Sequence, residues 1–86
     1  MIIGYPAHFK RAYKKIDKIR KEQANKALTI FTRDPFEPRL KNHKLSGNLS
    51  GVRAFSAGYD LRILYREKND HAHVFLMQIG RHDDVY

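Results

Sequence analysis

Two stripes of apolar residues at helical spacing fill the first third of the chain and limit what it can fold into. The first stripe consists of Phe9, Tyr13 and Ile16, and the second consists of Ala24, Ala27, Leu28 and Phe31. Apolar residues that recur every three or four positions predict amphipathic helices. The apolar pattern lapses around Lys18–Arg20, and Asp34-Pro35 ends the second stripe. We therefore expect two consecutive helices that form a hairpin.

Segments rich in β-forming residues lie on both sides of this hairpin. One strand is expected within residues 1–5, and three more at 52–57, 61–66 and 72–79. Residues 34–51 contain Pro, Gly, Asn and Ser and predict a loop. The last strand is apolar at almost every position, so we expect both of its faces to be buried. The resulting order, β-α-α-β-β-β in a single domain 1–86, predicts an α+β fold with a small, mainly antiparallel, twisted sheet and a helical hairpin packed on one side.

The charge of the chain indicates a polyanionic partner. The net charge is +8 over 86 residues, and residues 1–43 hold eleven Lys and Arg against four Asp and Glu. Such an excess favours RNA, DNA or an acidic protein as partner. The sequence has no cysteine, which excludes disulfides and thiolate metal sites and fits the reducing cytoplasm. No apolar run has the roughly 20 residues of a membrane span, so we expect no membrane association.

Groups capable of acid–base chemistry gather in the last seven residues, Gly80-Arg81-His82-Asp83-Asp84-Val85-Tyr86. Such an end is either solvated and inert or part of a site that the fold positions. A second candidate cluster, His71 and His73, is two residues apart and would face one side of a strand. Two imidazoles without a further ligand do not make a zinc site, so no metal is expected.

Four short motifs resemble the RelE/ParE superfamily of bacterial and archaeal toxins, and most of all its YafQ-like branch. They cover residues 42–47, 51–53, 60–65 and 80–86, in the order, spacing and total length of that superfamily. The resemblance implies the toxin of a type II toxin–antitoxin system, an endoribonuclease that cuts mRNA on the translating ribosome without a cofactor. It implies a cognate antitoxin as partner, ribosomal RNA contacts through the basic face, and operator DNA binding by the toxin–antitoxin complex.

The resemblance also implies the site residues. By position in the motifs, the catalytic group would be His43, Asp60, His82 and Tyr86, and Arg53 and Arg62 would face the RNA. Arg81 and Lys44 are the other cations that we expect to bind RNA or its phosphates. One histidine of the family pattern falls on Ser56, which cannot act as an acid or base at neutral pH.

These residue types suit metal-free RNA cleavage. Imidazoles are available in both protonation states near neutral pH and can serve as base for the 2′-hydroxyl and as acid for the leaving 5′-oxygen. The sequence does not say which histidine has which role. Asp60 would orient a neighbouring histidine, arginines would bind the phosphate, and Tyr86 would stack on a base or donate a proton.

Two other functions remain open at this stage. A ParE-like inhibitor of DNA gyrase would share the fold but would not need the histidines. A catalytically weakened member that only binds an antitoxin is suggested by Ser56.

Overall fold

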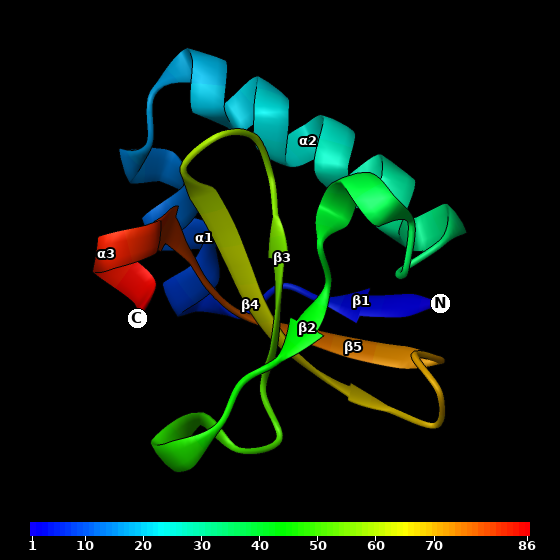
Figure 1. Cartoon of the computed structure of the whole chain (residues 1–86). Coiled ribbons are helices and arrows are strands. Elements are labelled where there is room, and N and C mark those ends of the chain that lie inside the picture. Colours follow the sequence, from blue (N-terminus) through cyan, green and yellow to red (C-terminus); the bar gives the residue numbers. More distant parts are fainter.

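The computed structural model describes residues 1–86, the side chain of Asp84 excepted, and forms one sheet with helices against it (Figure 1). In chain order the elements are β1 (Ile2–Gly4), α1 (Ala7–Lys15), α2 (Lys18–Arg33), β2 (His43–Lys44), β3 (Arg53–Ser56), β4 (Leu61–Lys68), β5 (His73–Arg81) and α3 (His82–Val85), with 3₁₀ turns at Pro38–Leu40 and Gly47–Leu49. The strand order is β1-β5-β4-β3-β2. β1 pairs with β5 in parallel, and the other neighbours pair antiparallel. The α+β prediction is confirmed, with β2 inside the predicted loop and α3 at the C-terminus as additions.

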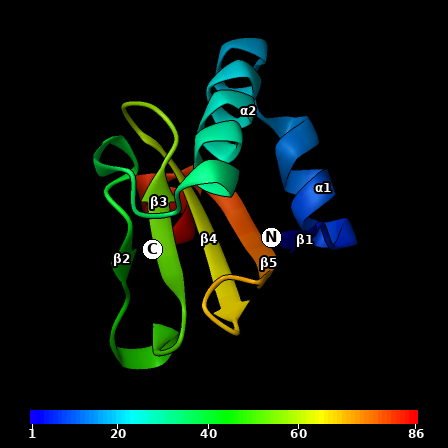
Figure 2. The ribbon, with the colours of Figure 1, turned by 90° about the vertical axis from the view of Figure 1, so that its right-hand side faces the viewer.

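The bend between the two long helices lies at Ile16-Asp17, slightly before the predicted position. Ile16 has extended backbone angles, and Asp17 caps α2 by accepting the Arg20 backbone N–H at 2.8 Å. Aspartate is a favoured capping residue because its side chain satisfies an amide that has no partner within the helix. The hairpin therefore starts its second helix at Lys18 and lies over one face of the sheet (Figure 2).

The main core fills the space between this hairpin and the sheet. Phe31 of α2 stacks on Phe55 of β3 with ring centroids 4.5 Å apart, and it meets the edge of Tyr65 at 4.9 Å. All three rings are fully buried. On β4, Leu61, Ile63 and Tyr65 all belong to this core, as expected for alternate residues on one side of a strand.

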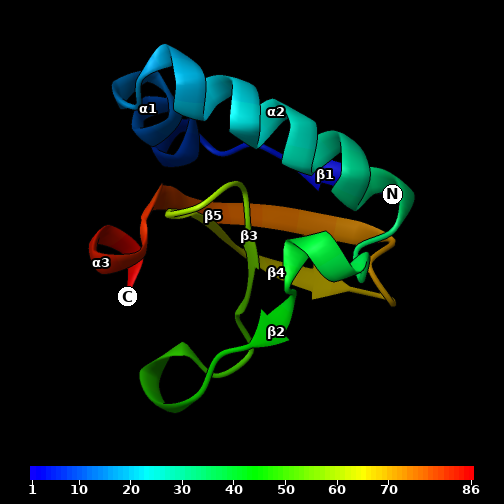
Figure 3. The same ribbon diagram turned by 45° about the horizontal axis from the view of Figure 1, so that its top comes forward.

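The opposite face of the sheet has no long helix over it (Figure 3), and we call it the open face. A second, smaller cluster of Val52, Ala54 and Leu64 is buried there, with Met77 and Val85 packed against it. The prediction that β5 is buried on both faces is wrong: Phe75 is 51% exposed on the open face. A register shift between Leu64 and Tyr65, where β5 has an extra residue, gives Met77 no direct partner in β4.

None of the helices in the described part of the chain combines the length and the apolar character that a membrane crossing requires.

Candidate functional site

Strand register divides the predicted site residues between the two faces of the sheet. Residues directly opposite each other in paired strands share a face. His43 lies opposite Ala54, which belongs to the open-face cluster. Arg62 lies opposite Ser56 on one side and Gly80 on the other, two positions from the open-face residue Leu64. His43, Ser56 and Arg62 therefore share the open face.

The C-terminal tail folds back against this same face. Val85 of α3 packs on the open-face cluster, and the Tyr86 backbone N–H donates to the His82 carbonyl oxygen at 3.2 Å. The rings of His82 and Tyr86 meet edge to face, with centroids 4.5 Å apart. Burial raises the pKa of Tyr86, and the charge of Arg62 lowers it in part. The phenol therefore keeps its proton at neutral pH and lies within electrostatic reach of Arg62.

His43 lies at the other side of the open face. Its side chain is exposed, and its Nδ1 lies 2.9 Å from the Lys41 carbonyl oxygen. The tautomer that donates this hydrogen bond leaves Nε2 free to accept a proton. Three strand spacings separate β2 from β5, about 14 Å in total. Strand β2, which holds His43, and helix α3, which begins at His82, lie apart (Figures 1 and 3), so the structure does not bring the two histidines together as an acid–base pair.

Asp60 is bound to the helical layer and not to a histidine side chain. Its Oδ2 accepts a hydrogen bond from Arg20 Nη2 at 2.8 Å and lies 3.9 Å from Arg81 Nε. The Arg20 hydrogen bond lowers the pKa of this carboxyl. The Asp60 carbonyl oxygen accepts the His82 backbone N–H at 3.0 Å. The expected contact between the carboxylate and an imidazole is thus replaced by a backbone contact to His82.

Three of the predicted RNA ligands lie on the helix side of the sheet. Arg53 is opposite Tyr65, donates from Nε to Asn42 Oδ1 at 2.9 Å, and has its guanidinium 5.1 Å from the centre of the Phe36 ring. Lys44 is opposite Arg53 and shares its face. Arg81 is opposite the core residue Leu61. Of the four predicted RNA ligands, Arg62 is the one that shares the open face with His43.

Sequence reasoning missed two residues of the open face, Arg66 and Phe75. They lie opposite each other on β4 and β5, and both are exposed. Arg66 extends over Gly51, where an added Cβ would lie 2.8 Å from its Nη1. Gly51 has φ +83°, a backbone conformation that favours glycine. The alternation of Arg62, Leu64 and Arg66 along β4 was the signal that could have found Arg66.

A match over the whole length of the chain shows which family it belongs to. The family described as "Bacterial toxin of type II toxin-antitoxin system, YafQ" matches residues 1–86. The chain belongs to this toxin family. No curated protein sequence matches it.

Solved structures show the same fold at low sequence identity. YafQ from E. coli strain BL21(DE3) has a TM-score of 0.81 at 17% identity, over 98% of this chain and 96% of that one. The YoeB/ParE toxin from Agrobacterium tumefaciens has a TM-score of 0.75 at 20% identity, over 95% and 99%. The toxin–antitoxin complex RelBE2 from Mycobacterium tuberculosis has a TM-score of 0.73 at 20% identity, over 93% and 95%.

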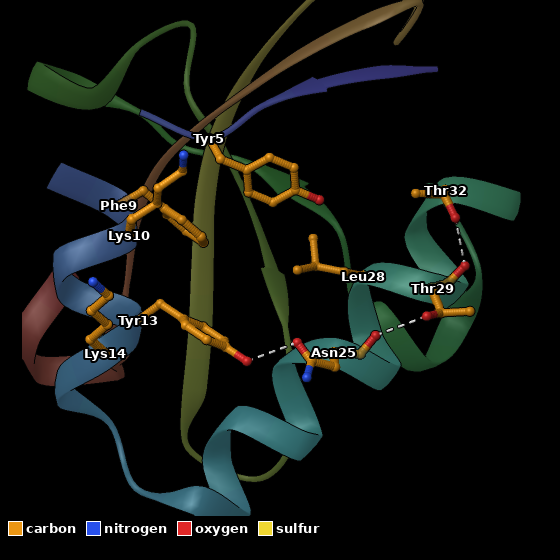
Figure 4. Close-up of a pocket in the computed structure, with 9 residues that line it drawn as sticks. All are labelled: Tyr5, Phe9, Lys10, Tyr13, Lys14, Asn25, Leu28, Thr29 and Thr32. Carbon is orange, nitrogen blue, oxygen red and sulfur yellow. Dashed lines mark hydrogen bonds between the residues drawn. The ribbon is translucent and has the colours of Figure 1, made fainter. Parts of the chain in front are cut away.

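A groove in the toxin's helical layer lies apart from the open face (Figure 4). Its volume is about 630 Å³, and Tyr5, Phe9, Tyr13 and Leu28 form its apolar walls between α1 and α2. The Tyr13 hydroxyl donates to Asn25 Oδ1 at 3.1 Å and ties the two helices together at one end. The ammonium groups of Lys10 and Lys14 add positive charge at its border.

The second histidine cluster does not form a pair. His71 lies in the turn before β5 with φ +65°, whereas His73 is the first residue of the strand. The His71 ring is buried in the helix-side core, its Nε2 is 2.7 Å from the Tyr65 hydroxyl, and burial lowers its pKa. His71 therefore has a structural role. Within the described residues no group of three or more His, Asp or Glu is arranged to hold a metal ion.

Proposed function

We propose that this toxin is an endoribonuclease that cuts mRNA bound to the ribosome, and that the RNA lies on the open face of the sheet. The observation that carries the proposal is the His82–Tyr86 ring pair, 4.5 Å apart, on the face that Arg62 shares and that no long helix covers. Together these groups offer an imidazole, a phenol and a guanidinium to one phosphate of a single strand. RNA cleavage without a metal ion needs groups that exchange protons and a cation that binds the phosphate, and these three side chains can supply both.

Each group has a distinct task. The imidazole of His82 exchanges a proton with the 2′-hydroxyl or with the departing 5′-oxygen, and the planar fork of Arg62 binds two phosphate oxygens. Tyr86 stacks on the adjacent base or donates its phenolic proton. His43 and Arg66 lie farther along the same face and bind the flanking nucleotides.

The proposal extends to partners and place of action. The apolar groove between α1 and α2, with its two lysines, fits an acidic segment of a cognate antitoxin. The Lys- and Arg-rich helices meet ribosomal RNA when the antitoxin is absent, and the toxin–antitoxin complex binds operator DNA. All these partners are found in the cytoplasm.

The direct test is cleavage of a ribosome-bound mRNA by purified protein, read by primer extension. The His82→Ala variant should lose about 10² to 10⁴ in cleavage rate, because it removes one general acid or base. His43→Ala should reduce the rate less, since His43 lies on β2, three strand positions away from β5, after which His82 follows. His8→Ala is the matched control, because His8 is an exposed histidine of α1.

Two results would contradict the proposal. One is a His82→Ala protein that is folded and cleaves as fast as the parent. The other is a parent protein that leaves mRNA intact but blocks supercoiling by DNA gyrase, which would favour a ParE-like function. A parent that does neither and still binds its antitoxin would indicate a catalytically weakened member.

A further inference from the structure

Arg20 joins two carboxylates that are far apart in the sequence. Its Nη1 donates to Asp17 Oδ2 at 2.6 Å, and its Nη2 donates to Asp60 Oδ2 at 2.8 Å. Asp17 is the capping residue of α2, whereas Asp60 lies 40 residues beyond Arg20. A guanidinium suits this position because its planar fork holds two donors in fixed directions, which an ammonium group cannot do.

Asp60 belongs to the turn that connects β3 and β4, and α2 contacts this turn at two points. One point is the Arg20–Asp60 ion pair. The other is Gly58, where an added Cβ would lie 2.7 Å from the side chain of Gln23. Arg20 and Gln23 are three residues apart and so lie on the same side of α2. The turn is therefore held by one side of the helix.

The same turn contacts the C-terminal tail through its backbone. The Asp60 carbonyl oxygen accepts the His82 N–H at 3.0 Å, at the residue where α3 begins. Because α3 has four residues, it cannot fix its own position by helix formation. Contacts at its first residue thus set the direction in which the His82 ring leaves the sheet.

We propose that Arg20 is a positioning residue for His82. Its fork holds Asp60, and the Asp60 carbonyl fixes the His82 amide and with it the imidazole that meets Tyr86. This inference rests on the proposed ribonuclease function for its effect on rate. The link from Arg20 through Asp60 to the His82 amide, which we call the tether, is a property of the folded chain and can be measured without RNA.

The test compares Arg20→Gln with Arg39→Gln. Arg39 forms an exposed ion pair with Glu37 at 2.7 Å, so its substitution breaks one ion pair, where Arg20→Gln breaks two, on a 3₁₀ turn away from the tail. Amide hydrogen exchange of His82, followed by NMR, should be at least about tenfold faster in Arg20→Gln, because the acceptor of this amide is no longer held in place. The exchange rate in Arg39→Gln should equal that of the parent.

The second measurement is steady-state cleavage of ribosome-bound mRNA. We expect kcat to fall between about tenfold and a hundredfold in Arg20→Gln with KM nearly unchanged, since misplacement of a catalytic group by about 1 Å costs this much. Arg20→Lys keeps the charge and should recover only part of the loss. Asp60→Asn should behave like Arg20→Gln, and the double variant should be no slower than either single variant, because all three break the same link.

The outcomes separate the two proposals. If His82 exchange in Arg20→Gln matches the parent, the tether is overturned whatever the activity. If exchange rises but kcat does not change, the tether exists without a role in catalysis and the positioning inference fails. A parent protein without any cleavage activity contradicts the ribonuclease function, and the exchange measurement still decides whether Arg20 holds His82. Should Arg20→Gln not fold, Arg20→Lys and Asp60→Asn provide the same comparison.

Discussion

Removal of one buried hydroxyl, in the variant Tyr65→Phe, should lower the stability of the toxin measurably. Tyr65 is fully buried, and its hydroxyl has two partners. It donates to His71 Nε2 at 2.7 Å and accepts from Asn42 Nδ2, also at 2.7 Å. Asn42 Nδ2 keeps a second acceptor in the variant, the Pro35 carbonyl at 2.9 Å. The Nε2 atom of His71 would lose the one hydrogen bond that the described residues give it.

The loss of stability therefore comes from His71 alone, because Asn42 keeps an acceptor in the variant. A buried polar group without a partner costs about 1 to 3 kcal/mol, and here one such group is created. We therefore expect the unfolding free energy to fall by about 1 to 3 kcal/mol. In a domain of this length each kcal/mol corresponds to roughly 4 to 8 °C in Tm.

The assay is urea unfolding at pH 7.5, followed by circular dichroism. The midpoint should fall while the slope m stays constant, because the surface exposed on unfolding is unchanged. Tyr59→Phe removes the same hydroxyl from a side chain that is 96% exposed, and it should change the free energy by less than about 0.5 kcal/mol. If Tyr65→Phe also stays within about 0.5 kcal/mol of the parent, the hydrogen bond to His71 contributes no stability and the reasoning is refuted.

Three further results are expected. Burial lowers the pKa of His71, so on acidification the unfolded chain binds a proton at this imidazole before the folded chain does, and the urea midpoint should fall as the pH drops below about 6.5. The variant His71→Asn should flatten the dependence of the urea midpoint on pH between pH 7 and 5, because asparagine does not titrate and tolerates the positive φ. Phe31→Ala should cost about 3 to 5 kcal/mol in urea unfolding, because it empties the centre of the stacked core. Ser56→His places an imidazole on the open face opposite Arg62 and should raise the mRNA cleavage rate.

Local sequence patterns were sufficient for most of the fold. The helical hairpin and strands β3, β4 and β5 follow from apolar periodicity and lie close to their predicted ranges. Strand β2 could not be predicted, because two polar residues, His43-Lys44, have no periodicity and become a strand only by pairing with β3. Phe75 has the same apolar character as the core residues around it. Its exposure depends on the absence of a long helix over the open face, which is a property of the whole fold.

Predicting the site required a further step, from sequence position to face of the sheet. Arg53 could have been assigned to the helix side of the sheet from the sequence, since it shares its strand face with Phe55, a clear core residue. Arg62 was ambiguous, because Leu61, Ile63 and Leu64 are all apolar and either side of β4 could face the main core. The partner of Asp60 could not be predicted, because Arg20 is 40 residues away. It lies on a helix with several Lys and Arg residues, and nothing in the sequence distinguishes Arg20 among them as the partner.

The tail illustrates why a sequence can identify functional residues and still leave their use undecided. A helix of four residues has no stability of its own, and the contact from His82 Nδ1 to Asp83 Oδ1 is 3.5 Å long, too weak to fix the ring. The ring is held from outside, by Val85 packed on the small open-face cluster and by the Asp60 carbonyl that accepts the His82 amide. Both contacts come from other strands and turns, and neither leaves a pattern in the tail itself. Without them the same seven residues would be a solvated end, and with them the tail is packed against the open face.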